Sequence, residues 1–305
     1  MDLASPPARR RRARGFVAFA AAILLSPGAS ARNEGLRVFL SADMEGLSGI
    51  AHSEMTSASG AEYGRGRDLM MSDVNAAIQG ALDAGATEIL VNDSHGSMRN
   101  VRVEQLLPPA RLISHNSKPF GMMQGISGDF DAVFFIGYHA RAGNPDGLMA
   151  HTGSGASIRE IRVDGRPAGE GDLNALLAAH HGVPVALATG DEAFAKELGE
   201  LLPDTEFVAV KRAIRRTTAE LLHPEVTARL IREAATRALE SIPEPLAAPG
   251  PSVAIEIQYT RPDLAEIASL LPQIERVAPD TVRFEAGDMA EGYAIIRVLY
   301  RNLSE

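Results

Sequence analysis

Two patterns of apolar residues alternate along the chain after residue 35. Short runs that are apolar almost throughout, such as residues 132–138 (AVFFIGY), are typical of strands buried on both faces of a sheet. Between such runs, Met70, Val74 and Ile78 recur at the four-residue spacing of a helix, which Gly85 is expected to end. The same reasoning predicts strands at residues 36–41, 88–92, 111–114, 132–138, 158–163, 184–189, 206–210, 252–259 and 282–285, and helices at residues 70–82, 171–182, 224–240, 264–271 and 289–300.

The repeated alternation of strand and helix determines the predicted fold class. It favours an α/β fold with a mostly parallel sheet flanked by helices. Residues 158–163, followed by the turn Asp164-Gly165, predict a hairpin. Residues 241–251 (SIPEPLAAPGP) are rich in proline and mark a possible subdomain join, after which we expect a C-terminal α/β subdomain.

A basic and then apolar N-terminus precedes the predicted fold. Five arginines lie within residues 9–14, residues 15–25 are apolar, and residues 29–31 (ASA) form a small-residue cleavage site. This order predicts an export signal at residues 1–31 and a mature domain at residues 32–305, periplasmic or secreted and free of the membrane after cleavage. The apolar run is about half of the ~20 residues that span a bilayer. An uncleaved anchor is the alternative, and the arginines do not decide between the general and twin-arginine routes.

Charge and cysteine content limit the partners of the mature chain. Removing residues 1–31 takes away five arginines and one aspartate, so the formal net charge changes from −9 to −13. An acidic protein of this kind is not expected to bind nucleic acid or anionic lipid. The chain has no cysteine, which excludes disulfides and thiolate ligands. Any bound metal must therefore be held by histidine, aspartate and glutamate.

Three predicted strands are each followed directly by residues that bind metals. Residues 36–41 lead into Asp43 and Glu45, residues 88–92 lead into His95, and residues 132–138 lead into His139. In an open α/β sheet, ligands bind in the crevice outside the carboxyl ends of the parallel strands. Separate segments are therefore expected to bring carboxylates and imidazoles to one edge, as a metallohydrolase requires.

The spacing of the two acids favours a bound metal ion. In an extended segment, Asp43 and Glu45 point to the same side, where two unpaired carboxylates would repel each other. A divalent cation makes the pair favourable, and Gly46 allows a sharp turn after it. The alternative is a solvated acidic turn. Asp93, two residues before His95, either accepts a hydrogen bond from its ring or caps the turn.

Two further residues are candidates with ordinary alternatives. His151 lies in LMAHTGS, and Glu170 follows Gly169 at a predicted helix start, where a carboxylate is stabilised by the helix N-terminus. Taken alone, Glu170 is typical of an acid in the first turn of a helix, and a single histidine is typical of a hydrogen-bonded loop residue. Several such residues predicted at one sheet edge make coincidence a weaker explanation.

Five segments in order resemble one known family. SADMEGLSGI, VNDSHGSMRN, FFIGYHARAG, MAHTGS and GEGDLNALLAAHHGVPVALATGD are similar to the M55 family of zinc D-aminopeptidases, of the dipeptide-transport-operon D-aminopeptidase type. The similarity covers essentially the whole chain from about residue 36. Each segment is a weak signal alone, but their joint order and spacing are specific.

The resemblance implies a site and an assembly. It implies two zinc ions per chain, held by Asp43, Glu45, His95, His139 and Glu170, with His151 as the catalytic histidine. It also implies a ring-like homo-oligomer, described as a decamer, whose active sites face an inner channel. The family's archetype is cytoplasmic, whereas this chain carries an export signal, so its physiological substrate is a separate question.

The implied reaction is the release of N-terminal D-amino acids, such as D-alanine, from short peptides. A hydroxide made available near neutral pH by two zinc ions, with Asp43 between them, would attack the scissile carbonyl. His151 would stabilise the tetrahedral intermediate or protonate the leaving amine. The alternatives are another exported metallo-amidase or phosphoesterase, and a non-catalytic periplasmic ligand-binding protein.

Overall fold

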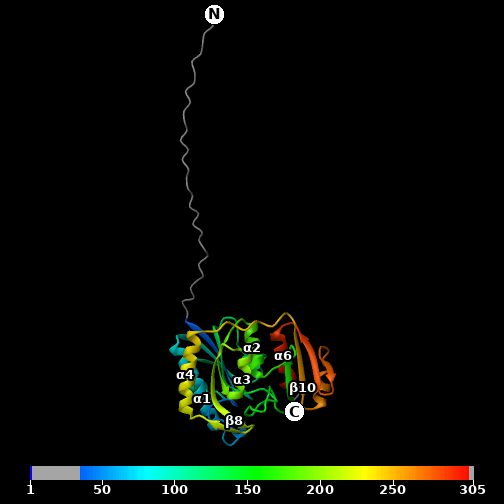
Figure 1. The fold of residues 1–305 in the computed structure, drawn as a ribbon, viewed down its shortest axis with the longest axis horizontal. Helices are drawn as coiled ribbons and strands as arrows, with labels where there is room; N and C mark the ends of the chain where they lie inside the picture. Colours follow the sequence, from blue (N-terminus) through cyan, green and yellow to red (C-terminus); the bar gives the residue numbers. More distant parts are fainter. Residues whose placement is uncertain (2–34, 302–305) are drawn as a thin grey trace. The chain divides into compact units, whose positions relative to one another are not determined.

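A seven-stranded sheet forms the centre of the fold (Figure 1). The computed structural model describes residues 35–301 together with Met1, so the rest of the predicted export signal lies outside the described residues. Neighbouring strands are parallel except for the last pair, which is antiparallel. In spatial order the strands are β3 (Arg111–Ile113), β2 (Ala86–Asp93), β1 (Leu36–Ala42), β4 (Ala132–Tyr138), β7 (Val185–Asp191), β8 (Glu206–Arg215) and β9 (Thr218–Leu221).

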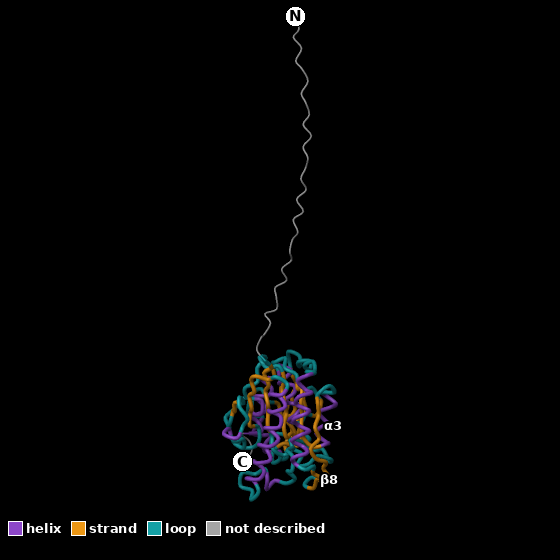
Figure 2. Tube along the Cα trace, turned by 90° about the vertical axis from the view of Figure 1, so that its left-hand side faces the viewer, coloured by secondary structure: helices purple, strands orange, loops and turns teal. Residues whose placement is uncertain are grey.

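Helices cover both faces of this sheet, as the predicted fold class requires (Figure 1), and Figure 2 shows helices lying over strands when the molecule is turned by 90°. On β1, Val38 and Leu40 pack into the core shared with α1 (Tyr63–Asp83) and α4 (Pro224–Glu240). Phe39 points the other way, into the core shared with α2 (Glu170–His180) and α3 (Glu192–Leu201). Burial on both faces explains why these strands are apolar almost throughout. The α/β fold with a mostly parallel, helix-flanked sheet is thus confirmed.

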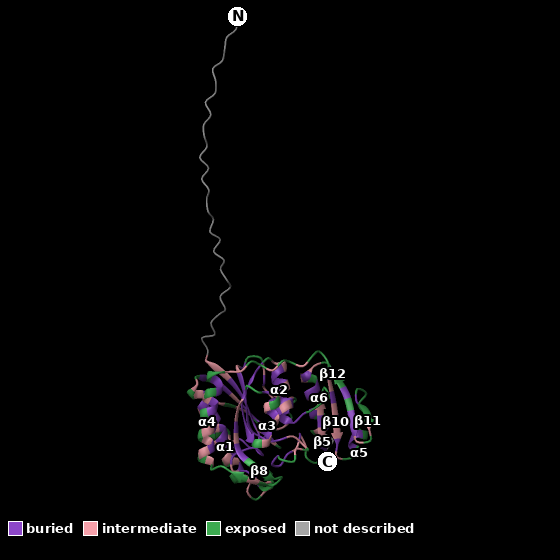
Figure 3. Cartoon of the chain, in the orientation of Figure 1, coloured by how far each residue is buried: buried purple, intermediate pink, exposed green. Residues whose placement is uncertain are grey.

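A second, antiparallel sheet packs on the side of α2 and α3. Its spatial order is β11 (Glu275–Ala278), β12 (Thr281–Ala286), β10 (Val253–Tyr259), β5 (Ile158–Val163) and β6 (Arg166–Pro167). Alternate residues of β10 are buried against a core that includes α5 (Pro262–Ala268) and α6 (Met289–Arg301) (Figure 3). This sheet combines the C-terminal strands with the hairpin β5–β6, so it is not built from C-terminal residues alone.

The predicted hairpin and the predicted join both fall at irregular backbone. Asp164 and Gly165 have φ values of 50° and 78°, which is the conformation of a two-residue hairpin turn. The segment 242–252, between α4 and β10, contains neither helix nor strand and connects the first sheet to the second.

Several elements were not predicted, and each has a physical reason. Helix α3 follows β7 without a loop, because the Asp191 side chain accepts a hydrogen bond from the Phe194 N–H and caps the helix directly. Strands β9 and β11 are short, largely exposed edges with little apolar pattern. The short 3₁₀ helices are η1 (Ser53–Met55), η2 (Val103–Gln105) and η3 (Gly121–Met123). Within residues 35–301, no helix is long and apolar enough to cross a membrane.

The direction of winding reverses between β1 and β4. From β1 the chain proceeds outward to β2 and β3, and then returns to the other side of β1 to form β4, β7 and β8. Such a switch point opens a crevice at the carboxyl ends of the two strands. The residues that follow β1 and β4 therefore flank this crevice.

Candidate metal centre

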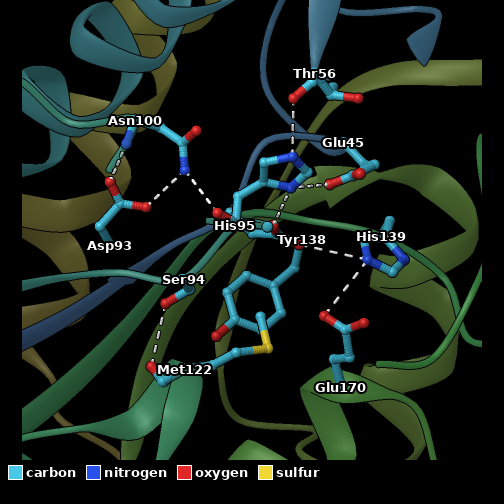
Figure 4. A network of polar contacts seen from close by, with 12 residues as sticks. Glu45, Thr56, Asp93, Ser94, His95, Asn100, Met122, Tyr138, His139 and Glu170 are labelled. Carbon is cyan, nitrogen blue, oxygen red and sulfur yellow. Dashed lines mark hydrogen bonds and ion pairs between the residues drawn. The ribbon is translucent and has the colours of Figure 1, made fainter. Parts of the chain in front are cut away.

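The residues that follow β1, β2 and β4 converge at the switch point (Figure 4). The Asp43 N–H donates to the Ile136 carbonyl of β4 at 2.8 Å, and the Ser94 N–H donates to the Ala42 carbonyl at 2.8 Å. These bonds continue the parallel ladder beyond the strand ends and fix the directions of the next side chains. His95 and His139 are thereby brought to the same edge as the two carboxylates.

Asp43 lies between the two histidines. His95 Nδ1 is 3.2 Å from Asp43 Oδ1 and 2.9 Å from Glu45 Oε2. His139 Nε2 is 3.4 Å from Asp43 Oδ2 and 3.6 Å from Glu170 Oε2. One carboxylate is therefore shared by two rings, while Glu45 and Glu170 close the group on either side.

Glu170 connects this group to His151. As the first residue of α2, Glu170 is directed toward the site, and its Oε1 accepts a hydrogen bond from the Gly153 N–H at 2.7 Å. His151 Nε2 lies 3.6 Å from the same oxygen. The rings of His139 and His151 stack with centroids 4.1 Å apart and an interplanar angle of 9°. All six side chains predicted from the sequence thus come together, and their roles as ligands or catalytic group stay predictions.

Each of the three histidine rings is oriented by a backbone carbonyl. His95 Nε2 lies 3.0 Å from the Thr56 oxygen, His139 Nδ1 lies 3.0 Å from the Ala140 oxygen, and His151 Nδ1 lies 3.0 Å from the Met149 oxygen. A carbonyl only accepts, so the facing nitrogen must carry the proton. In the neutral ring, the opposite nitrogen then presents a lone pair to the site, which is the usual arrangement of metal-binding histidines.

The buried carboxylates and imidazoles of the site shift each other's pKa values. Burial alone would raise the pKa of the Asp43 carboxyl, but the adjacent rings of His139 and His95 hold it below its ordinary value. Burial would lower the pKa of His95, but Glu45 and Asp43 raise it well above the ordinary value. The carboxylates and imidazoles thus favour each other's charged forms, and a divalent cation would supply the same positive charge to the carboxylates.

The donor atoms fit a metal site. Asp43 Oδ2, Glu45 Oε2 and His139 Nε2 are buried and make no hydrogen bond within the described part of the chain, although charged groups lie close to them. Ligand atoms of Asp43, Glu45 and His139 all lie within 4.8 Å of one another, and so do those of His139, His151 and Glu170. Imidazole and carboxylate donors in such groups suit zinc. Geometry alone also admits His151 as a ligand, which makes its role a matter for experiment.

Asp93 does not orient His95. Its carboxylate accepts hydrogen bonds from the N–H groups of Asn100 and Val101, and from the Asn100 side-chain amide. That amide also donates to the His95 carbonyl at 2.7 Å. Of the two predicted roles, Asp93 therefore caps the turn that carries His95, while the Thr56 carbonyl lies next to the ring.

Lys211 supports the loop that carries the two acids, although the sequence did not single it out. It lies on β8, is buried, and its Nζ donates to the carbonyl of Glu45, to that of Leu47 at 2.9 Å and to that of Ile50 at 2.7 Å. Burial lowers the pKa of Lys211 to about 8. The sequence signal that would have identified Lys211 is its position at the end of an apolar strand pattern.

Gly46 is required here for a different reason from the one predicted. A Cβ at this position would lie 1.7 Å from the Tyr138 carbonyl oxygen, so the backbones of the two segments touch. The Gly46 N–H donates to the Gly137 carbonyl at 2.8 Å across the same contact. Close approach of the loop to β4, and not a left-handed turn, excludes a side chain.

A small cavity of about 100 Å³ opens onto the site. Its wall includes Asp43, His95, His151 and Glu170, and also side chains of α6 at the far end of the chain. Among these is Arg297, which the sequence did not single out. Its signal was present, because it lies among the buried residues of an otherwise apolar helix stripe.

Comparisons with known proteins agree with this geometry. The model of the family Peptidase M55, described as D-aminopeptidase, matches residues 36–298. The D-aminopeptidase of Bacillus subtilis (strain 168) is 39% identical over 267 residues, which cover 87% of this chain and 96% of that protein. Among solved structures, the Zn-dependent D-aminopeptidase DppA from Bacillus subtilis, a self-compartmentalizing protease, matches with a TM-score of 0.85 and 38% identity, covering 88% of this chain and 98% of that one.

The predicted resemblance is therefore confirmed. The match spans both sheets and every residue of the candidate metal centre. Neither a phosphoesterase nor a binding protein is favoured by these relatives. This chain belongs to the Peptidase M55 family of D-aminopeptidases and is a metallo-aminopeptidase of that class.

Proposed function

We propose that this enzyme uses zinc to release N-terminal D-amino acids, of the D-alanine type, from short peptides. The observation that carries the proposal is the group of buried carboxylate and imidazole atoms at the β1/β4 switch point, several of them without a hydrogen bond in the described structure. Family membership supports the D-aminopeptidase reaction, and the zinc dependence of the Bacillus subtilis enzyme DppA supports zinc as the metal.

The proposed centre holds two zinc ions per chain, bound by Asp43, Glu45, His95, His139 and Glu170. Five ligands exceed the four of a single tetrahedral site. The carboxylate of Asp43 lies between His95 and His139, with a different oxygen toward each ring, so it would contribute a ligand atom on both sides of the centre. Asp43, Glu45 and His139 form one compact group of candidate ligand atoms, and Glu170 shares His139 with a second group.

The proposed roles of the metal and of His151 follow from where the side chains lie. Bound metal supplies a Lewis acid for the scissile carbonyl and lowers the pKa of an attacking water. His151 Nδ1 is held by the Met149 carbonyl, and its Nε2 faces Glu170 beside the cavity. From that position His151 donates a proton to the leaving amine or stabilises the developing oxyanion. Acidic side chains at the site attract the free α-ammonium group of the peptide.

Hydrolysis of D- and L-alanyl dipeptides by the zinc-loaded protein tests the reaction. We expect release of N-terminal D-alanine and almost no release of L-alanine, because the wrong hand loses alignment of its carbonyl with the metal. Phosphoesters serve as the control for the alternative metallohydrolase. Equal cleavage of both alanine isomers would contradict the D-selectivity and indicate a general aminopeptidase.

We also propose that the mature chain is exported and forms a ring-like homo-oligomer, for which the family suggests a decamer. The basic and apolar N-terminal sequence supports export, to the periplasm or outside the cell. The self-compartmentalizing nature of DppA supports a closed assembly. N-terminal sequencing of fractionated protein, with a start near residue 32, tests export, and the mass in solution tests the assembly.

A further inference from the structure

Arg297 is a buried cation without an acidic partner. It lies on α6 and is 8% exposed. Its Nη1 donates to the Tyr300 hydroxyl at 2.6 Å, and its Nη2 faces the Met98 sulfur at 3.8 Å. Neither partner is charged, and within residues 35–301 Arg297 forms no ion pair. Burying a guanidinium without a counter-charge is costly, which is an arrangement expected where a ligand supplies the anion.

The two buried lysines, Lys118 and Lys211, differ from Arg297 in how their donors are satisfied. Lys118 Nζ donates to Asn92 Oδ1 at 2.8 Å and to the carbonyls of Asp93 and Ile113 at 2.7 and 3.2 Å. Lys211 is likewise surrounded by three carbonyl oxygens. Both ammonium groups use all three donors on oxygen atoms of the fold. Arg297, with more donors, finds one hydroxyl and one sulfur.

The Arg297 side chain shares a cavity with the metal centre. The cavity of about 100 Å³ is lined by Arg297 and Tyr300 on one side and by His95, His151 and Glu170 on the other. The Tyr300 ring packs on Gly153, where a Cβ would lie 3.0 Å from it. The Gly153 N–H in turn donates to Glu170. Tyr300, Gly153 and Glu170 therefore form a continuous cavity wall between the Arg297 guanidinium and the predicted ligands.

The guanidinium is also held in place before any ligand arrives. A Cβ at Gly121, whose φ is +43°, would lie 2.8 Å from Arg297 Nε, so the backbone of η3 lies directly against the side chain. Tyr300 fixes Nη1, and its ring also receives the cation on its face, with the guanidinium carbon 5.5 Å from the ring centroid. A fork of donors held this way binds a carboxylate with little loss of entropy.

We propose that Arg297 binds the C-terminal carboxylate of the substrate, and that the preferred substrate is a dipeptide. This inference rests on the proposed function, which places the scissile carbonyl at the metal centre. A planar guanidinium matches a carboxylate in a bidentate pair. Arg297 and the side chains of the metal centre line the same small cavity of about 100 Å³, so only a short segment lies between the cleaved bond and the guanidinium. A dipeptide is the shortest peptide that carries a carboxylate beyond the cleaved bond.

The test compares D-alanyl-D-alanine with its C-terminal amide on the zinc-loaded enzyme. We expect wild type to favour the free carboxylate by roughly 10- to 100-fold in kcat/KM, mainly through KM, as a charge-assisted hydrogen-bonded pair predicts. In Arg297→Met this ratio is expected to fall close to one, and in Arg297→Lys to lie in between, since lysine keeps the charge but not the fork. The ratio is taken on one preparation, so it does not depend on the fraction of folded enzyme.

Two other arginines make the assignment specific. Arg283→Met, on an exposed position of β12, is expected to keep the wild-type ratio. Arg301 lines the same cavity, so loss of the ratio in Arg301→Met with retention in Arg297→Met would overturn the assignment. Equal hydrolysis of dipeptide and amide by wild type would also overturn it, while leaving the proposed function intact. Hydrolysis of neither peptide would overturn the proposed function and this inference with it.

Discussion

Asp43→Ala is expected to lose bound zinc and peptidase activity together. Asp43 is the carboxylate that faces both His95 and His139, so its removal takes one ligand from each half of the centre. The loss of activity should exceed the roughly 10- to 100-fold typical of mutating groups that only surround a metal's ligands. On the same preparation, elemental analysis measures the zinc content, and hydrolysis of a D-alanyl dipeptide measures the peptidase activity.

Asp93→Asn provides the matched control for this experiment. Asp93 is also a buried acid two residues from His95, but it caps a turn through the N–H groups of Asn100 and Val101. Asparagine retains an oxygen that accepts these bonds, so zinc content should stay at the wild-type level. If Asp43→Ala kept its zinc while Asp93→Asn lost it, the assignment of Asp43 as a ligand and of Asp93 as a turn cap would be wrong.

His151→Ala is expected to keep its zinc and its fold but to lose turnover by roughly 10²- to 10⁴-fold, the range of a general acid or base. His151 meets the centre through Glu170 and by stacking on His139, and its ring is held by a carbonyl of its own loop. Removing it leaves the five proposed ligands in place. The change should appear in kcat, because proton transfer is made in the transition state.

The opposite outcome for His151 would be equally informative. His151, His139 and Glu170 form one of the two possible ligand groups, so loss of zinc in His151→Ala would make it a ligand. His180→Ala serves as the control, because His180 lies at the end of the same helix that Glu170 begins. We expect that variant to match wild type in both zinc content and turnover.

Sequence patterns predicted which side chains converge at the candidate metal centre because most of these residues directly follow strand ends. Asp43, His95 and His139 follow three apolar runs, and the rule for open α/β sheets places the carboxyl ends of such strands at one crevice. The prediction needed no side-chain detail, only the order of strands and helices. Glu170 was weaker for the same reason, since it lies at a helix start and not at a strand end.

Other parts of the site were beyond pattern analysis. The carbonyls of Thr56, Ala140 and Met149 orient the rings, and any residue type supplies a carbonyl. Arg297 reaches the cavity because α6 packs across it, a contact between opposite ends of the chain that local periodicity does not contain. The second sheet escaped prediction similarly, because the pairing of β5 with β10 joins distant segments.

The zinc content of wild-type protein, titrated from the metal-free state, tests the central claim most directly. The five proposed ligands at the β1/β4 switch point predict close to two zinc ions per chain, with D-alanyl dipeptide hydrolysis appearing as the zinc ions bind. Elemental analysis gives the count, and a parallel activity assay gives the dependence. Protein that holds no transition metal, and that zinc does not activate, would contradict the account.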